Sequence, residues 1–260
     1  MKSTSSSCPS HGSVVDLSTL RVACADCSLS ELCVPLGLEE GDLDRLERVI
    51  SRGRPVARGS RIYDAGDAFR SLYAIRSGSV KIYRTDAEGD TQIMSFHLPG
   101  ELIGVEAIAT GTHMLTAEAL EDASLCELPF ERLDSLATEI PNLHHQLLRL
   151  MSREVLIEQE QIIVSSHRKP EQRVAHFILM MSERSRLRGC DGRCLRLGMR
   201  RGDIANYLGL ALETVSRQLT RLQQAGWIQV SNRDIEILDL EALRAEAGIT
   251  ATPRENRHAS

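Results

Sequence analysis

Short apolar runs separated by glycine fill residues 55–130. The clearest β-like runs span residues 71–75, 80–83 and 92–96. Glycine recurs around them every 7 to 12 residues, at Gly59, Gly66, Gly78, Gly89, Gly100 and Gly111. Glycine turns between short strands are typical of an antiparallel sandwich or roll. We therefore expect a β-roll in this part of the chain.

The pattern becomes helical after Phe130. Residues 131–166 contain no glycine, and Pro141 is their only proline. One set of positions steps by three and four residues, as the a and d positions of a two-helix contact do. This seam consists of Leu148, Met151, Val155, Glu158 and Ile162. We expect a long helix that pairs with a second copy of the chain. The alternative is a single helix packed on its own domain.

Glu158 is the charged member of this seam. In a symmetric parallel pair, two Glu158 side chains would face each other. Like charges brought together out of water are costly, so such a helix would be poised between monomer and dimer.

The C-terminal third predicts a DNA-reading domain. An amphipathic helix is expected over residues 170–187, followed by a short helix over residues 203–208. Gly209 then makes a turn into a second helix over residues 212–225, which is the spacing of a helix–turn–helix. Residues 227–238 read as a hairpin behind it, which makes the motif winged.

Polar side chains near the start of the second helix are expected to face DNA. They are Glu213, Thr214, Ser216, Arg217, Gln218 and Arg221. Arg217 can donate two hydrogen bonds to guanine, Glu213 can accept from cytosine N4, and Ser216 can do either. Arginines placed for phosphate contacts are Arg200, Arg201 and Arg221. The alternative is an ordinary helical hairpin with a solvated charged face.

The charge of the chain supports a division of labour. A chain of 260 residues can hold one large or two ordinary domains, and its 42% hydrophobic and 26% charged residues are usual for a globular protein. The net charge of −5 would by itself argue against nucleic acid. From residue 168 onward, however, the chain has 16 basic and 11 acidic residues, whereas residues 1–167 have 15 basic and 25 acidic residues. Any nucleic-acid contact is therefore expected at the C-terminal end.

Compartment and cysteine use are linked. No apolar run reaches the ~18 residues of a membrane span. The Ser-rich residues 1–20 contain no secretory signal and are expected to be a mobile tail. We therefore expect a cytoplasmic protein without membrane contact, in which thiols stay reduced. Its seven cysteines then read as metal ligands, redox groups or small buried side chains.

Three cysteines are close together in the sequence. Cys24, Cys27 and Cys33 have the spacing Cys-x2-Cys-x5-Cys, and three thiolates this close can bind a metal or one face of a cluster. The spacing does not choose iron–sulfur over zinc. Candidates for the fourth ligand are Cys8, Cys126, Cys190 and Cys194. The alternative for Cys126, in an expected strand over residues 124–128, is a buried core thiol. On spacing alone Cys190 and Cys194 could be half of a zinc site, and the alternative is an incidental pair.

The order of these parts resembles the Crp/Fnr superfamily of bacterial transcription regulators, over about residues 20–240. Within it, the chain is similar to the oxygen-sensing Fnr/Anr branch. The Asp-Cys-Ser-Leu-Ser-Glu-Leu-Cys run at residues 26–33, with Cys24 ahead of it, carries the likeness, as does Cys126. Two further motifs are Arg-Gly-Asp-Ile-Ala-Asn-Tyr-Leu-Gly-Leu at residues 201–210 and Glu-Thr-Val-Ser-Arg at residues 213–217.

The resemblance implies an α+β protein with an antiparallel β-roll of the cyclic-nucleotide-binding type, a long dimerisation helix and a C-terminal winged helix–turn–helix. It implies domains at residues 21–130, 131–166 and 167–242, with a flexible tail at residues 243–260. It also implies a [4Fe-4S] cluster, which oxygen converts to [2Fe-2S] so that the active dimer is lost. The implied cluster ligands are Cys24, Cys27, Cys33 and Cys126.

The resemblance further implies a homodimer that binds DNA and contacts RNA polymerase, with the polymerase surface on the roll. Glu158 would oppose dimerisation in the cluster-free form, although some relatives have Asp there. A palindrome resembling TTGAT–N4–ATCAA would be read by Glu213, Ser216 and Arg217.

The sequence argues against two other classes of function. No arginine for a cyclic phosphate follows Pro99-Gly100-Glu101, so we expect no cyclic nucleotide. The roll holds only His97 and His113 as histidines and shows no nucleophile–base arrangement, so we expect no enzyme. The alternative function is a zinc-stabilised Crp-like regulator that responds to a different small effector.

Overall fold

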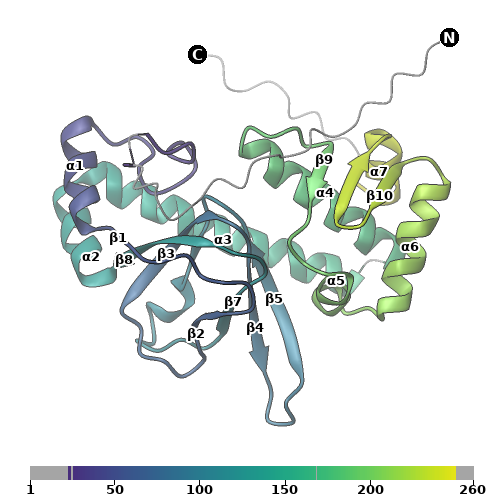
Figure 1. Cartoon of the computed structure of the whole chain (residues 1–260), viewed down its shortest axis with the longest axis horizontal. Helices are drawn as coiled ribbons and strands as arrows, with labels where there is room; N and C mark the ends of the chain where they lie inside the picture. The colour runs from purple at the N-terminus through teal and green to yellow at the C-terminus, as the bar shows by residue number, and fades with distance from the viewer. Residues whose placement is uncertain (1–22, 25, 168, 250–260) are drawn as a thin grey trace. The chain divides into compact units, whose positions relative to one another are not determined.

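A computed structural model of the chain describes residues 23, 24, 26–167 and 169–249 (Figure 1). The described residues form two compact units, and the boundary falls within one long helix, between Glu160 and Gln161. We call the described residues up to Glu160 the roll unit and those from Gln161 on the helix–turn–helix unit. The tail expected at residues 1–20 lies outside the described residues, and so does Cys8.

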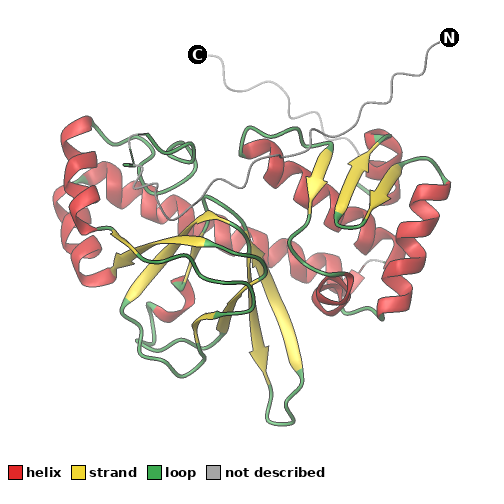
Figure 2. Ribbon diagram, in the orientation of Figure 1, coloured by secondary structure: helices red, strands yellow, loops and turns green. Residues whose placement is uncertain are grey.

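Two antiparallel four-stranded sheets form the roll (Figure 2). One has the order β1-β8-β3-β6 and the other β2-β7-β4-β5. The strands are β1 (Ser51–Arg52), β2 (Arg61–Tyr63), β3 (Ser71–Ser77), β4 (Val80–Thr85), β5 (Thr91–His97), β6 (Leu102–Ile103), β7 (Thr116–Ala119) and β8 (Ser124–Pro129). A short 3-10 helix, η1, covers Val105–Ala107. All the apolar runs singled out in the sequence are strands, and the expected roll is confirmed.

Glycine is required at the turn between β3 and β4. Gly78 has a φ of +80°, and a Cβ built there would lie 2.7 Å from the carbonyl oxygen of Asp122. A side chain would therefore meet backbone as well as adopt a left-handed conformation. The glycine pattern of the sequence has a steric cause at this position.

The helical segment expected over residues 131–166 is two helices rather than one. They are α2 (Phe130–Glu139) and α3 (Pro141–His167). Ile140 between them is extended, with φ −118° and ψ 97°. The cause is Pro141, which lacks a backbone N–H and disfavours the α conformation of the residue before it.

A second core joins the helices to the roll. Helix α1 (Glu40–Val49), which was not expected from the sequence, lies beside α2 (Figure 1). Arg45 of α1 pairs with Glu139 of α2. Fully buried members of this core come from the loop before α1, from α1, from sheet β1-β8-β3-β6, from α2 and from α3. They include Val34, Leu46, Leu72, Leu128, Leu133 and Leu143. This core fixes the loop and α3 on the same sheet.

The helix–turn–helix unit follows the expected order. Its elements are α4 (Pro170–Leu187), β9 (Cys194–Arg196), α5 (Arg201–Leu208), α6 (Leu212–Gln224), β10 (Ile228–Ser231), β11 (Asp234–Ile237) and α7 (Leu240–Glu246). Gly209 ends α5 in the left-handed conformation, as the turn requires. The wing has a third strand that the sequence did not predict, because β9 pairs with β11.

The first residues of the expected flexible C-terminal tail are helical. Residues from 243 on were expected to be flexible, yet α7 continues to Glu246 and Leu243 is fully buried. The burial of this leucine anchors the last turn of α7.

Among the helices that the structure describes, none is long and apolar enough to cross a membrane.

Candidate functional site

Four cysteines line one pocket of the roll unit. Cys24, Cys27 and Cys33 come from the loop before α1, and Cys126 comes from β8. Much of the remaining lining is apolar, and it includes Leu29, Val34, Pro35, Ile50, Ile75 and Leu128. Of the candidates for a fourth ligand that the structure describes, Cys126 lines this pocket. Cys190 and Cys194 lie in the helix–turn–helix unit.

The loop and the strand hold the cysteines differently. The loop is a series of tight turns, in which the N–H of Cys27 donates to the carbonyl of Cys24 and that of Cys33 to the carbonyl of Leu29. Cys126 lies within the sheet, paired with Arg52 on β1 and Ala74 on β3. Three candidate ligands therefore lie on a turn-built loop, and the fourth lies on a strand that pairs with a neighbouring strand on each side.

A glycine lets the loop approach the roll closely. Gly100, between β5 and β6, has a φ of +90°, and a Cβ built there would lie 3.1 Å from Cβ of Leu32. A side chain at this position would push against the loop between Cys27 and Cys33. The glycine at position 100 therefore allows both the turn between β5 and β6 and the close approach of the cysteine loop.

Charged groups surround Cys24. A guanidinium nitrogen of Arg52 lies 3.8 Å from its Sγ, and another lies 2.5 Å from the carboxylate of Glu47. Glu47 in turn accepts a hydrogen bond from the backbone N–H of Cys24 at 3.0 Å. The hydrogen bond from Arg52 lowers the pKa of Glu47 to about 2. Both partners are therefore charged at neutral pH.

Burial favours the protonated form of Cys24, Cys33 and Cys126. Together with the hydrogen bond and the charge of Glu47, burial raises the pKa of Cys24 to about 12. Burial also raises the pKa of Cys33 to about 12 and that of Cys126, although Arg52 and Arg76 act against the rise at Cys126. Metals bind the thiolate form, so a bound group must displace protons here. Sequence reasoning missed these two arginines, because no local motif marks them.

The number of thiols bears on the kind of bound group. Zinc holds four thiolates at about 2.3 Å each, around one point. An iron–sulfur cluster takes the same number of thiolates and spreads them over several iron atoms. Among the described residues, no group of three or more Cys, His, Asp or Glu is arranged to hold a metal ion, and the four cysteines of the pocket suit either bound group by number.

Helix α3 has two different faces. Its inner face carries Leu143, Gln146 and Leu150, which are at most 8% exposed. On the other face, Leu148 and Val155 are about half exposed, at 51% and 50%. The rest of the expected seam comprises Met151, which is partly buried, Glu158, which is exposed, and Ile162, which is 65% exposed. The helix does pack on its own domain, but the seam is left largely uncovered.

The start of α6 presents the expected reading residues. Glu213 and Arg217 are exposed, while Thr214 and Ser216 are partly so. Val215, Leu219 and Leu222 are buried on the other side. Gln218, expected on the exposed face, is instead buried. The reason is its place beside Arg221, which donates to its side-chain oxygen at 2.9 Å.

Arg221 has partners inside its own domain. Besides Gln218 it pairs with Glu246 of α7, and its guanidinium lies 5.9 Å from the ring centre of Trp227. These contacts hold α6 against α7. The side chain of Arg221 is still 42% exposed, so the phosphate contact expected of it stays a prediction.

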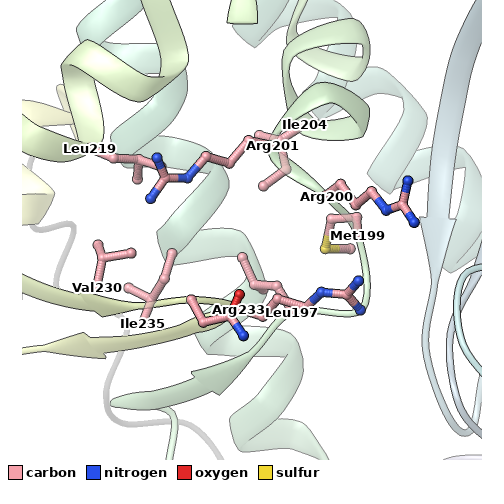
Figure 3. A pocket seen from close by; sticks show the side chains of 10 residues that line it. Leu197, Met199, Arg200, Arg201, Ile204, Leu219, Val230, Arg233 and Ile235 are labelled. Atoms are coloured by element: carbon pink, nitrogen blue, oxygen red, sulfur yellow. The ribbon is translucent and has the colours of Figure 1, made fainter. Parts of the chain in front are cut away.

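Three other arginines surround a hollow of about 350 Å³ beside α6. Arg200 and Arg201 stand at the start of α5, and Arg233 stands at the tip of the wing (Figure 3). The walls are largely apolar and include Leu197, Met199, Ile204, Leu219, Val230 and Ile235. Sequence reasoning missed Arg233. The left-handed conformation of Asn232, with φ 57°, makes the tight turn that places it.

A β-roll with a cysteine-lined pocket, followed by a winged helix–turn–helix, defines a DNA-binding transcription regulator. Residues 54–139 match the family described as "Cyclic nucleotide-binding domain" and residues 172–246 the "Crp-like helix-turn-helix domain". The chain is 47% identical to the Fumarate and nitrate reduction regulatory protein of Salmonella typhimurium, over 88% of its own length and 92% of the relative. It belongs to the Crp/Fnr family of transcription regulators, which are not enzymes.

Other relatives support the same family. The transcriptional activator protein anr of Pseudomonas aeruginosa is 45% identical, over 86% of this chain and 92% of that protein. Among solved structures, FixK2 from Bradyrhizobium japonicum superposes with a TM-score of 0.71 at 28% identity, over 78% of this chain and all of FixK2. The fold and the resemblance expected from the sequence are thereby confirmed.

Proposed function

We propose that this protein is an oxygen-responsive transcription regulator that carries a [4Fe-4S] cluster. The observation that carries the proposal is the single pocket lined by Cys24, Cys27, Cys33 and Cys126. Relatives over most of the chain are named for fumarate and nitrate reduction, which supports a role in anaerobic metabolism. When bound, the cluster would supply the chemistry that reacts with oxygen.

The charges around the pocket suit such a group. A [4Fe-4S] cluster with four thiolates has a net negative charge, and it would lie in a largely apolar pocket, where an unpaired charge is costly. Arg52, 3.8 Å from the sulfur of Cys24, and Arg76, which lines the pocket, offer the opposite charge. The zinc alternative would use the same four thiols, and metal and sulfide analysis separates the two.

The uncovered face of α3 supports a homodimer. Leu148 and Val155 would be removed from water by a second copy of the helix, which is favourable. In that pair the two Glu158 side chains would repel each other. We expect the cluster-bound state to favour the dimer strongly enough to outweigh this repulsion. Loss of the cluster would then allow the repulsion to separate the two copies.

The dimer would present two α6 helices to DNA. Two-fold related recognition helices read half-sites about 34 Å apart, so the operator should be a palindrome resembling TTGAT–N4–ATCAA. Glu213, Ser216 and Arg217 would contact base edges. Arg200, Arg201 and Arg233, around one hollow, would contact phosphates.

Other partners follow from the same proposal. A regulator of this kind acts in the cytoplasm and contacts RNA polymerase, through a surface that we place on the roll. We expect no cyclic nucleotide. His113 is buried in the roll and stacks on Tyr63, with ring centres 3.7 Å apart. The segment from Glu101 to Leu120, which contains His113, carries no arginine for a cyclic phosphate.

Anaerobic purification tests the proposal. The protein should contain iron and acid-labile sulfide and should be dimeric. After exposure to air its visible absorbance should change, and sizing should show a shift toward the monomer. Zinc without labile sulfide would favour the zinc-stabilised alternative. A colourless, iron-free protein that is dimeric under both conditions would overturn the sensing mechanism.

Base reading is tested at Arg217. Replacing it with alanine should cost about 1–3 kcal/mol of binding free energy on the palindromic site and much less on random DNA, because a bidentate contact to guanine is lost. Binding of both DNAs to the cluster-loaded protein measures the difference. Gln224→Ala, at the exposed far end of α6, serves as the control. An equal loss on random DNA would reduce Arg217 to a phosphate contact.

A further inference from the structure

A buried glutamine joins α3 to the cysteine loop. Gln146, on the inner face of α3, is only 3% exposed. Its side-chain Nε2 donates a hydrogen bond of 3.0 Å to the backbone carbonyl of Cys33. Its Oε1 is also buried and has no hydrogen-bond partner among the described residues.

Burying an amide at position 146 is energetically costly. Leu143 and Leu150, one turn away on either side, belong to the apolar core together with Val34 of the cysteine loop. A buried amide is costly unless it is hydrogen-bonded, and half of this one is not. An apolar side chain would suit the packing better, so the bond to Cys33 is what the glutamine adds.

We propose that Gln146 is a positioning residue that couples the cysteine loop to the dimer seam. The inference rests on the proposed function, because it assigns Cys33 as a cluster ligand. A ligated Cys33 has its thiolate held, and its carbonyl then stays where Gln146 can reach it. A released Cys33 leaves the loop free to move, and the buried amide loses its acceptor.

The seam lies on the same turns of the helix. Leu148 and Met151 follow Gln146 by two and five residues. Leu148 is half exposed on the side of α3 away from Leu143 and Leu150, and Met151 is partly buried. A shift of these turns, made to satisfy the amide, would displace the seam that a second copy must meet. A second bond, from Asn142 to the carbonyl of Gly37 at 3.2 Å, is exposed to water and adds little.

The coupling is measurable without DNA. The dimer dissociation constant is measured by sedimentation for the cluster-loaded protein and for the cluster-free protein, and the ratio of the two constants is the coupling. Gln146→Met keeps the length of the side chain and removes the donor. It should still bind iron and sulfide, yet its ratio should be about three- to tenfold smaller than that of the natural protein. Asn142→Ala should leave the ratio within about twofold.

A second variant guards against a packing defect. Gln146→Asn keeps the amide but is too short to reach the carbonyl, so it should reduce the ratio as Gln146→Met does. If either variant folds, keeps the cluster and retains the natural ratio, the inference is wrong. If both lose the cluster or fail to fold, Gln146 is a structural residue and the inference is also wrong. A natural protein without iron and sulfide would instead overturn the proposed function itself.

Discussion

Cys126→Ala should yield a protein that holds almost no iron or labile sulfide when purified without oxygen. Cys126 is the one candidate ligand that the sheet holds in place, paired with residues of β1 and β3 on its two sides. The other three come from a loop that a bound group would help to order. Removing the fixed thiolate leaves an incomplete set of ligands around the pocket.

The loss of the cluster should also weaken dimerisation and DNA binding. Without the cluster the seam is not favoured, so the variant should be monomeric and should bind the operator about 5- to 150-fold more weakly. Sizing and operator titration of the anaerobic protein measure both effects. Cys190→Ala, which alters an exposed thiol in the other unit, should retain the cluster. If Cys126→Ala keeps its iron and sulfide, the fourth ligand lies elsewhere and the proposed site is wrong.

Glu158→Ala should give a dimer that binds the operator in air. The side chain is exposed on the seam face of α3, in step with Leu148 and Val155. Removing two facing carboxylates takes away the repulsion that opposes pairing of the cluster-free helix, whereas the apolar contacts remain. The dimer dissociation constant of the cluster-free protein should fall by about tenfold or more.

The charge itself can be separated from the size of the side chain. Glu158→Gln keeps the size and removes the charge, so it should behave like the alanine variant. Gln159→Ala changes the next residue, which is exposed but off the seam, and should remain monomeric in air. Sedimentation and operator binding in air distinguish these results. A monomeric Glu158→Ala protein would show that the seam does not control assembly.

The elements of the fold could be predicted from the sequence because their signals are local. Glycine spacing marks the strands of the roll, and the apolar pattern of residues 170–187 gives α4 with the bounds that the structure shows. Gly209 and the buried positions of α6 mark the helix–turn–helix. The break before Pro141 also has a local cause, since the residue before a proline avoids the helical conformation. The sequence-based expectation nevertheless extended one helix across it.

For the residues expected to contact DNA, some properties could be predicted from the sequence and others only from the tertiary structure. The exposure of Glu213 and Arg217 follows from the period of α6, which the sequence contains. The partners of Arg221 do not follow from it, because Glu246 and Trp227 approach only when α7 and the wing fold back onto α6. The tip of the wing brings Arg233 to the hollow for the same reason.

Sequence alone determined that three cysteines are close together, since Cys24, Cys27 and Cys33 lie within ten residues. By residues alone it left four candidates for the fourth ligand, and only the family resemblance favoured Cys126. The structure brings Cys126 to the pocket, because the pairing of β8 with β1 and β3 spans long stretches of chain that no local pattern encodes. The bond from Gln146 to Cys33 joins residues 113 positions apart. Such a contact depends on how the whole core packs, and therefore only the tertiary structure could decide it.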